Sequence, residues 1–204
     1  KNVNSPSTLP TALRPTPDES GMTVPQLLQH RIDVLFEQVP LVAELGKVFA
    51  QAGHDLYLVG GSVRDALMGR LGHDLDFTTD ARPDTTEAIL RRCTHTTWDI
   101  GRAFGTIGAQ IDDWVVEVTT YRADAYHPDS RKPEIVYGDT LEDDLIRRDF
   151  TVNAMALHAM TRAFSDPYAG LADIVAGVLR TPFPPERSFS DDPLRMMRAA
   201  RFTS

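Results

Sequence analysis

The feature that most restricts the fold of this chain is a short apolar strand pattern that runs into two glycines. Residues 56–59 are Leu-Tyr-Leu-Val, and Gly60-Gly61 follows them directly. The glycine pair predicts a tight turn, and Ser62 is a typical N-cap for a helix that continues to about Leu71. A second short strand pattern begins at Leu75. This order of elements predicts a domain in which a sheet packs against helices.

The spacing of apolar residues predicts the other elements of the chain. Helices are predicted over residues 24–39, 40–53, 85–93 and 141–160, the last with a break near Arg148, and from about residue 190 to the C-terminus. Strands are predicted over residues 75–78, 106–111, 114–121 and 164–167, with a polar loop over 122–139. The Asp112-Asp113 turn makes two consecutive strands antiparallel, so we expect a mixed sheet of the α/β (α+β) class with flanking helices.

Composition divides the chain into parts with different expected roles. Residues 1–22 are rich in Pro, Ser and Thr, which is typical of a disordered tail. Residues 23–180 carry most of the strand and helix patterns and form the predicted main domain. Residues 181–204 hold the last helical pattern, which is still strong at Ser204. We therefore expect this part to be the start of a helical domain that is truncated.

Charge and cysteine content limit the partners of the chain. The formal net charge is −8, so we expect any RNA contact to be local, or to come from residues outside this chain. Cys93 is the only cysteine, which excludes an internal disulfide and agrees with a cytoplasmic location. No apolar run approaches ~18 residues, so no membrane span is expected. The sequence leaves the oligomeric state open.

Asp74 and Asp76 are the strongest candidates for catalysis. Side chains i and i+2 of a strand point to the same face, so the two carboxylates project side by side, flanked by apolar Leu75 and Phe77. Like charges at this spacing repel unless a cation lies between them. Hard divalent cations prefer oxygen ligands, so the pair predicts a Mg²⁺ site. The alternative is a solvated strand end.

The glycine turn is the second part of this candidate site. A helix that begins directly after a strand presents free backbone N–H groups and the positive end of its dipole, which suits a triphosphate. Arg64 lies one turn into the helix and can add a bidentate phosphate contact. Read alone, Gly-Gly-Ser is also an ordinary strand-to-helix turn.

The segment Leu58 to Gly69, with Asp74-Leu75-Asp76-Phe77, resembles the signature of the polymerase-beta-like nucleotidyltransferases. More narrowly, the chain is similar from about residue 55 to 202 to the bacterial tRNA nucleotidyltransferase (CCA-adding enzyme) and poly(A) polymerase family. The resemblance implies a nucleotidyltransferase head over residues 23–180 and the start of a helical neck over 181–204. It implies roles in metal binding for Asp74 and Asp76, and in nucleotide binding for Gly61 and Arg64.

Glu117 is a candidate for a third metal ligand. It lies in the apolar strand 115–119, where a charged side chain is unfavourable unless it pairs with another charge or binds a metal. The alternative is an ion pair with Arg122 or Arg148.

The segment 147–154, Arg-Arg-Asp-Phe-Thr-Val-Asn-Ala, is similar to a second motif of the family, with Val152 in place of Ile. By itself it also fits an amphipathic helix with surface charges. The resemblance implies that Arg148 contacts the nucleotide and that Asp149 and Asn153 organise the sugar pocket.

The last predicted helix carries Asp192, Arg195, Arg198 and Arg201 at three-residue intervals, which places them along one face. Surface salt bridges are one interpretation. In the other, these residues bind the nucleotide. Cytosine and adenine share an amino donor beside a ring-nitrogen acceptor, and uracil and guanine reverse this pattern. An Asp acceptor beside an Arg donor therefore matches C and A. The family's Glu-Asp-x-x-Arg element is similar, with Asp191 here in place of Glu.

The resemblance predicts a CCA-adding head that transfers CMP and AMP from CTP and ATP to a tRNA 3′ end with Mg²⁺. The segment Gly101 to Ile107 resembles the CCA-adding branch. A poly(A) polymerase, an enzyme that adds only CC or only A, and a nucleotide-binding fragment that is inactive without downstream domains are the alternatives. A plain RNA-binding module is disfavoured because the chain is acidic and lacks an aromatic stacking platform.

Overall fold

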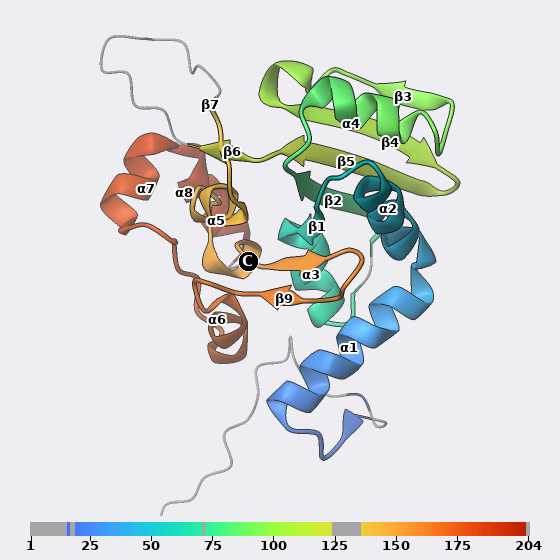
Figure 1. Cartoon of the computed structure of the whole chain (residues 1–204). Helices are drawn as coiled ribbons and strands as arrows, with labels where there is room; N and C mark the ends of the chain where they lie inside the picture. Colours follow the sequence, from blue (N-terminus) through green and yellow to red (C-terminus); the bar gives the residue numbers. More distant parts are fainter. Residues whose placement is uncertain (1–15, 17–18, 71, 124–135, 203–204) are drawn as a thin grey trace, which may run out of the picture.

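A mixed sheet lies at the centre of the molecule (Figure 1). The structure, a computed structural model, describes residues 16, 19–70, 72–123 and 136–202. The strands of this sheet are β1 (Leu56–Val59), β2 (Asp74–Thr79), β3 (Thr96–Trp98), β4 (Thr106–Ile111), β5 (Trp114–Thr120), β8 (Ala156–His158) and β9 (Phe164–Ser165). Their order is β3-β4-β5-β2-β1-β8-β9, with β2 and β5 parallel and the other neighbours antiparallel. The predicted mixed sheet is therefore confirmed.

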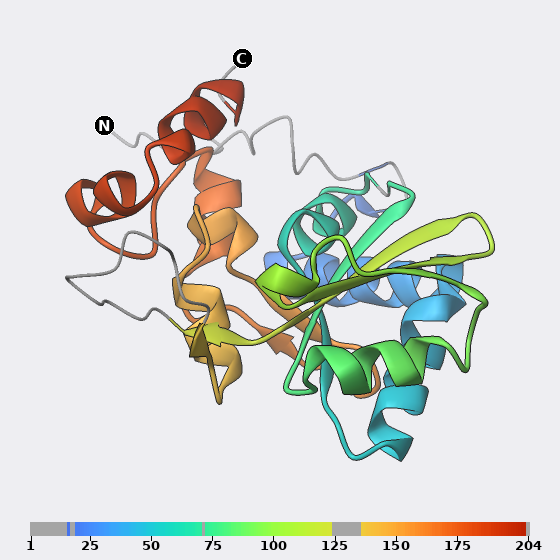
Figure 2. The same cartoon turned by 90° about the horizontal axis from the view of Figure 1, so that it is seen from above.

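Helices flank this sheet, as the apolar spacing predicts. The α-helices are α1 (Val24–Gln38), α2 (Pro40–Gln51), α3 (Gly60–Leu67), α4 (Pro83–Leu90), α5 (Leu141–Ile146), α6 (Gly170–Ala176), α7 (Pro185–Asp191) and α8 (Leu194–Phe202). The 3₁₀ turns η3 (Arg102–Phe104) and η4 (Thr151–Asn153) and the short pair β6 (Arg122–Ala123) and β7 (Val136–Tyr137) complete the elements named here. α2 packs against β1 and α4 against β4 and β5, whereas α7 and α8 lie at the other side of the molecule (Figures 1 and 2). None of the described helices is long and apolar enough to cross a membrane.

The two faces of the central strands differ in character. Leu58, Phe77 and Val118 are almost fully buried and belong to the main core. The register pairs Asp76 of β2 with Glu117 of β5, and both of these side chains are exposed on the opposite face. Because strand side chains alternate, the residues that anchor β2 in the core also direct its acidic positions outwards. The polar face therefore carries the candidate site.

The helix after the glycine turn begins earlier than the sequence predicts. α3 starts at Gly60 with Val59 as its N-cap, not after Ser62, and it ends at Leu67 rather than near residue 71. Gly60 has a φ of +66°, a left-handed conformation that glycine adopts without strain. The chain can therefore enter the helix directly from the end of β1, and the Ser62 hydroxyl is free for another role.

The prediction of a helix over residues 141–160 is wrong beyond its first part. α5 ends at Ile146, the chain turns through η4, and residues 156–158 form β8 beside β1. The expected break near Arg148 is confirmed. Ala156 and Leu157 are fully buried, and a short run of buried apolar residues has the same pattern in a helix and in a strand.

Other differences concern short elements. β3, α6 and α7 were not predicted. The last helix begins at Leu194, because Ser190 still belongs to α7. Most of the predicted loop at 122–139 lies outside the described residues, and β6 and β7 form at its two ends. The predicted domain limits at residues 22 and 180 stay a prediction.

A buried ion pair fixes the beginning of the described chain to α1. Residues 1–15, 17 and 18 of the expected tail lie outside the described residues, but Glu19 is only 5% exposed. Arg31 donates from Nε and Nη2 to the two carboxylate oxygens of Glu19, at 3.0 and 3.1 Å, and from Nη1 to the Leu67 carbonyl. The hydrogen bonds from Arg31 outweigh desolvation and lower the pKa of Glu19 to about 2.

This pair predicts a defined pH dependence of stability. A glutamate whose pKa falls from 4.5 in the unfolded chain to about 2 in the folded chain stabilises the fold by about 3 kcal/mol above pH ~4.5. This stabilisation is lost as the pH falls from 4.5 through 2. We expect Glu19→Gln to lower the free energy of unfolding by about this amount at pH 7 and by much less at pH 2.5. Urea unfolding across this range measures the difference.

The control is Glu37→Gln, which removes an exposed glutamate from α1. It should change the free energy of unfolding by less than about 0.5 kcal/mol at every pH. A Glu19→Gln effect that stays constant from pH 7 to pH 2.5 contradicts the ion pair.

Candidate active site

The carboxylates of Asp74 and Asp76 project from the same face of β2. Both side chains are exposed, whereas Leu75 and Phe77 between and beside them are buried at 2% and 1% exposure. The pair faces the glycine turn, because a Cβ placed on Gly60 would lie 3.9 Å from an Asp76 carboxylate oxygen. The structure therefore brings together the two halves of the site that the sequence predicts.

The hydroxyl of Ser62 holds β2 against the beginning of α3. It donates to the Asp74 carbonyl at 3.2 Å and accepts from the Asp76 backbone N–H at 3.0 Å. Both bonds go to the backbone of the residues that carry the acidic side chains. Ser62 thus positions the two carboxylates relative to the turn, a role that the sequence analysis missed because it assigned this serine to helix capping.

The local charges favour a cation beside these carboxylates. Desolvation raises the pKa of Asp76, against the opposing effect of Arg148, and Asp74 raises it further. Desolvation, Asp76 and Asp74 raise the pKa of Glu117, which is the neighbour of Asp76 across the parallel register. A divalent cation would relieve this repulsion, and carboxylate oxygens are the ligands that Mg²⁺ prefers. Asp74 and Asp76 therefore fit a Mg²⁺ site.

Glu117 is not supported as a third ligand. Among the described residues, no group of three or more His, Cys, Asp or Glu side chains is arranged to hold one metal ion. The alternative ion pair of Glu117 with Arg122 or Arg148 is not found in this part of the chain either. Glu117 contributes negative charge beside Asp76, and its role stays a prediction.

Arg148 closes the site from the side of α5. Its Nη2 donates to Asp144 at 2.8 Å, and its Nη1 lies 3.0 Å from the place where a Cβ of Gly60 would be. A side chain at Gly60 would be strained by the left-handed φ, and it would require the Arg148 guanidinium to shift. The arginine therefore lies directly over the glycine turn.

A chain of hydrogen bonds connects the first two sequence motifs. Arg64 binds the Asp65 carboxylate with Nε and Nη2, at 2.9 and 3.0 Å, and donates from Nη1 to the Asn153 side-chain oxygen. Asn153 in turn donates to an oxygen of Asp149 at 2.9 Å. Residues predicted to bind the nucleotide and to organise the sugar pocket are therefore adjacent.

The third motif joins the same network through α8. Arg198 donates from Nε to Asp149 at 3.0 Å and from Nη2 to Asp192 at 2.8 Å. Partial burial disfavours the ionised Asp192, but hydrogen bonds from Arg198 and from the Leu194 N–H outweigh it and lower the pKa of Asp192. Asp192 is thus kept as an ionised acceptor.

Arg195 and Arg201 differ in their surroundings. Arg195 donates from Nη1 to the Ser188 hydroxyl at 2.7 Å and from Nη2 to the Arg147 carbonyl at 2.6 Å, and its Nε is buried without a hydrogen-bond partner. Its Nε lies 3.9 Å from Asp192. Arg201 is exposed on the last turn of α8.

Three arginines form a positively charged pocket beside Asp76. A cavity of about 190 Å³ is lined by Arg122, Arg147 and Arg148, and Asp144 on its wall accepts a hydrogen bond from Arg148. The Nε atoms of Arg122 and Arg148 are buried without a hydrogen-bond partner. Desolvation lowers the pKa of Arg122, and Arg147 and Arg148 lower it further against the opposing effect of Asp144. We infer that the pocket suits a phosphate group.

The sequence analysis missed Arg122 and Arg147 as candidate site residues. Arg122 lies two residues after the end of β5, whose register places Glu117 and Thr119 on the polar face. An arginine that follows a strand with a polar face is the sequence signal that could have identified Arg122.

Comparison with known proteins gives consistent results. The family description "Poly A polymerase head domain" matches residues 56–180. The CCA-adding enzyme of Bacillus subtilis (strain 168) is 43% identical over 159 residues, which are 78% of this chain and 39% of that protein. A crystal structure of the Bacillus stearothermophilus CCA-adding enzyme in complex with CTP has a TM-score of 0.69 and 36% identity, and the match covers 83% of this chain and 39% of that one.

A second solved structure is similar. A tRNA nucleotidyltransferase complexed with a primer tRNA and an incoming ATP analog has a TM-score of 0.63 and 33% identity, covering 78% of this chain and 44% of the other. The chain spans about two fifths of the length of the relatives that it matches.

The repulsion around Asp76 predicts opposite effects on stability with and without metal. We expect Asp76→Asn to raise the melting temperature in metal-free buffer at pH 7.5 by about 1–2 °C, because it removes a charge that desolvation and Asp74 disfavour. The same variant should lose the stabilisation that millimolar Mg²⁺ gives the parent chain.

Thermal unfolding with EDTA and with MgCl₂ measures both effects. The matched control is Asp113→Asn, an exposed residue in the β4–β5 turn, which should keep the response to Mg²⁺. An undiminished Mg²⁺ shift in Asp76→Asn removes the case for a metal site here.

Proposed function

The chain belongs to the family of the poly(A) polymerase head domain, and from this we propose that it is the catalytic head of a CCA-adding tRNA nucleotidyltransferase. It would transfer CMP and AMP from CTP and ATP to the 3′ hydroxyl of a tRNA. The observation that carries the proposal is the hydrogen-bonded network that joins α3, the segment 147–154 and α8, together with the glycine turn that faces the carboxylates of β2. The names of the relatives, and their complexes with CTP, an ATP analog and tRNA, give independent support.

Asp74 and Asp76 would hold Mg²⁺. When bound, the metal would supply positive charge against the triphosphate during in-line displacement. The chain's own residues act around this centre. Ser62 fixes the spacing of the two acids, and the N–H groups at the beginning of α3, with Gly61 among them, present donors to phosphate oxygens.

The arginines would bind the phosphates and keep the leaving group in place. Arg148 lies over the glycine turn, and Arg122 and Arg147 extend the positive surface into the adjoining pocket. Buried guanidinium N–H groups without partners favour an anionic ligand, because a phosphate oxygen satisfies them. Arg64 is paired with Asp65 and Asn153, so its contact with the nucleotide would come through a change of partner or through its position beside the sugar pocket.

The base would be selected by Asp192 with Arg195, and Arg198 and Arg201 would complete the nucleotide site. An ionised Asp192 accepts from an exocyclic amino group, which cytosine and adenine possess and uracil lacks at the equivalent position. The lowered pKa of Asp192 supports this role. Arg195 would present its Nη1 and Nη2 donors to a base after their present bonds to Ser188 and Arg147 loosen.

Two alternative functions are favoured by particular observations. The family description names a poly(A) polymerase head, and partial addition of CC or A alone uses the same chemistry. A nucleotide-binding fragment without turnover is favoured by α8, where Leu194, Met196 and Met197 are 61%, 53% and 72% exposed. Exposed apolar residues of this kind are typical of a surface that packs against another domain, which would complete the surroundings of α8. A cytoplasmic location stays a prediction, which the bacterial origin of the tRNA-processing relatives supports.

The proposal predicts a specific pattern of nucleotide incorporation. We expect CMP to be added to tRNA transcripts that end before the first C or after C, and AMP to transcripts that end in CC. Labelled nucleotide incorporation measures this, with the chain alone and with the chain joined to the remaining part of the Bacillus subtilis relative. Asp74→Ala should lower the rate by about 100-fold or more while folding is retained.

Different results discriminate between the alternatives. AMP addition to every transcript, without CMP, indicates a poly(A) polymerase. Activity only in the joined protein identifies the chain as a binding fragment by itself. A near-normal rate in Asp74→Ala is incompatible with the assigned metal site.

The proposed selection of the base by Asp192 and Arg195 predicts that variants of these residues lose base discrimination. We expect Asp192→Ala or Arg195→Ala to reduce the preference for CTP and ATP over UTP and GTP by about 10-fold or more, because each removes one half of the donor–acceptor pattern. The ratio of kcat/KM values for the four nucleotides measures this preference. Arg91→Ala at the end of α4, which removes an exposed arginine paired with Glu87, is the matched arginine control and should leave the ratio unchanged. Unchanged discrimination in both Asp192→Ala and Arg195→Ala contradicts this role in base selection.

A further inference from the structure

An aromatic side chain lies on the polar face of the sheet, in one row with the acidic residues. The register pairs Trp98 of β3 with Gly108 of β4. It pairs Gly108 in turn with Glu117 of β5, and Glu117 with Asp76 of β2. Paired residues on neighbouring strands point to the same face of a sheet, so all four positions share the face that carries the candidate active site. Trp98 is at the outer end of this row, because β3 is an edge strand (Figure 1).

The missing side chain at Gly108 allows the indole to lie across β4. A Cβ placed on Gly108 would be only 2.0 Å from Nε1 and 2.1 Å from Cε2 of Trp98. The ring therefore covers the backbone of β4 and extends from the edge strand towards Glu117. A glycine inside a strand weakens the strand and often marks the close approach of another group. Here that group is the indole, and any other residue at position 108 would displace it.

The indole of Trp98 is not part of the core. Trp98 is half-buried, and its N–H makes no hydrogen bond to another described residue and is not among the buried atoms of this part of the chain that lack a partner. The second tryptophan of the chain, Trp114, packs against the main core instead. Part of the Trp98 ring and its N–H are therefore accessible on the face of the carboxylates. No spacing in the sequence indicates this arrangement, because only the pairing of neighbouring strands creates it.

The position of this row relative to the glycine turn fits an acceptor strand rather than the incoming nucleotide. β1, with the glycine turn and α3 after it, lies on one side of β2, and β5, β4 and β3 lie on the other. In an in-line displacement, the attacking oxygen and the leaving group are on opposite sides of the phosphorus. A triphosphate at the glycine turn therefore requires the attacking hydroxyl to come from the side of β5. Gly108 is two strands from Asp76, about 10 Å at the usual strand spacing, which is within reach of the base of a nucleotide whose 3′ hydroxyl lies beside Asp76.

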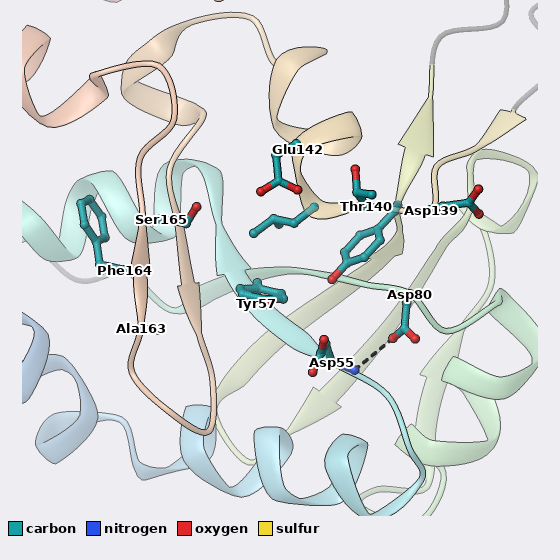
Figure 3. Close-up of a pocket in the computed structure, with 11 residues that line it drawn as sticks. Asp55, Tyr57, Asp80, Asp139, Thr140, Glu142, Ala163, Phe164 and Ser165 are labelled. Carbon is teal, nitrogen blue, oxygen red and sulfur yellow. Dashed lines mark hydrogen bonds between the residues drawn. The ribbon is translucent and has the colours of Figure 1, made fainter.

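The other end of β2 does not suit an RNA strand. A cavity of about 410 Å³ at this end has Asp55, Asp80 and Glu142 on its walls, and no Lys or Arg is among the described residues that line it (Figure 3). A small apolar cluster that includes Leu141 and Leu145 lies between this cavity and the candidate active site. The carboxylates repel the phosphate groups of a nucleic acid. We therefore expect an acceptor strand to approach from the side of β3 and β4.

We propose that Trp98, lying over Gly108, stacks against an unpaired base at the 3′ end of the acceptor RNA and so holds the attacking hydroxyl beside Asp76. This inference rests on the proposed function, because it takes the acceptor hydroxyl to react at the carboxylates of β2. An aromatic ring binds a base by its flat surface and tolerates every base. Such a contact suits an acceptor whose last base changes from one addition to the next.

The experiment uses the fluorescence of Trp98 itself. The chain has two tryptophans, so Trp114→Phe leaves Trp98 as the single indole. The probes are an RNA minihelix with a single-stranded 3′ end, the same minihelix with a blunt end, and CTP, each titrated in EDTA so that no transfer takes place. We expect saturable quenching by the minihelix with the single-stranded end and little quenching by the other two probes, because only an unpaired acceptor base reaches the ring.

The affinity of the same RNAs tests the contribution of the ring. Trp98→Leu should weaken binding of the minihelix with the single-stranded end about fivefold or more and change binding of the blunt minihelix less than about twofold. Trp98→Phe keeps an aromatic surface and should restore most of the affinity. The matched control is Trp114→Leu, the same change at the tryptophan that packs on the core, which should leave both affinities within about twofold. Fluorescence anisotropy of labelled RNA measures these values.

The inference is overturned if the single-stranded end quenches Trp98 no more than the blunt end does. It is also overturned if CTP alone quenches as strongly as the RNA, because the ring then binds the incoming base, or if Trp114→Leu weakens RNA binding as much as Trp98→Leu does. Quenching by the single-stranded end without nucleotide incorporation in the joined protein supports the RNA contact and contradicts the proposed transfer. Incorporation without such quenching contradicts the contact and leaves the proposed function in place.

Discussion

The carboxylate of Asp149 connects segments that are far apart in the sequence. One oxygen accepts from the Phe150 backbone N–H and from Asn153, and the other accepts from Arg198 of α8. Asn153 also accepts from Arg64, so α3, η4 and α8 are tied together around one charge. Hydrogen bonds to an ionised group are stronger than those between neutral groups, and a partly buried network of this kind is costly to leave incomplete. This carboxylate therefore ties the three motifs to one another, beside the apolar contact between Phe150 and Phe202 of α8.

The sequence predicted those parts of the site that follow from local geometry. Alternation along β2 places Asp74 and Asp76 together, and the glycine turn sets the beginning of α3 beside them. Contacts between distant segments were not predictable in this way. Ser62 looked like a helix cap but binds the backbone of β2, and β8 looked like helix because its residues are buried on both sides. The cluster around Arg122 forms where β6 packs against α5, which no spacing in the sequence reveals.

One short helix contributes to two pockets of opposite charge. The residues at the beginning of α5, Thr140 to Glu142, line a cavity whose wall also carries Asp55 and Asp80. Asp144, Arg147 and Arg148 at and after its end line the positive pocket beside Asp76. Leu141 and Leu145 pack on the sheet between them. At a rise of 1.5 Å per residue, the six residues of α5 span only about 9 Å. The charge along the polar face of the sheet therefore changes from negative to positive over about the length of this helix. The apolar cluster lies between the two regions.

The conformation of Gly60 makes two distant positions of the chain, 60 and 148, depend on each other. A substituent there meets two independent obstacles, the positive φ of +66° and the Arg148 guanidinium at 3.0 Å. A change in the backbone would remove the first obstacle but not the second, and shortening the arginine would remove the second but not the first. A larger residue at position 60 would therefore need both a strained backbone and a displaced Arg148 side chain. A change in the glycine turn would in this way reach the arginine that lines the positive pocket.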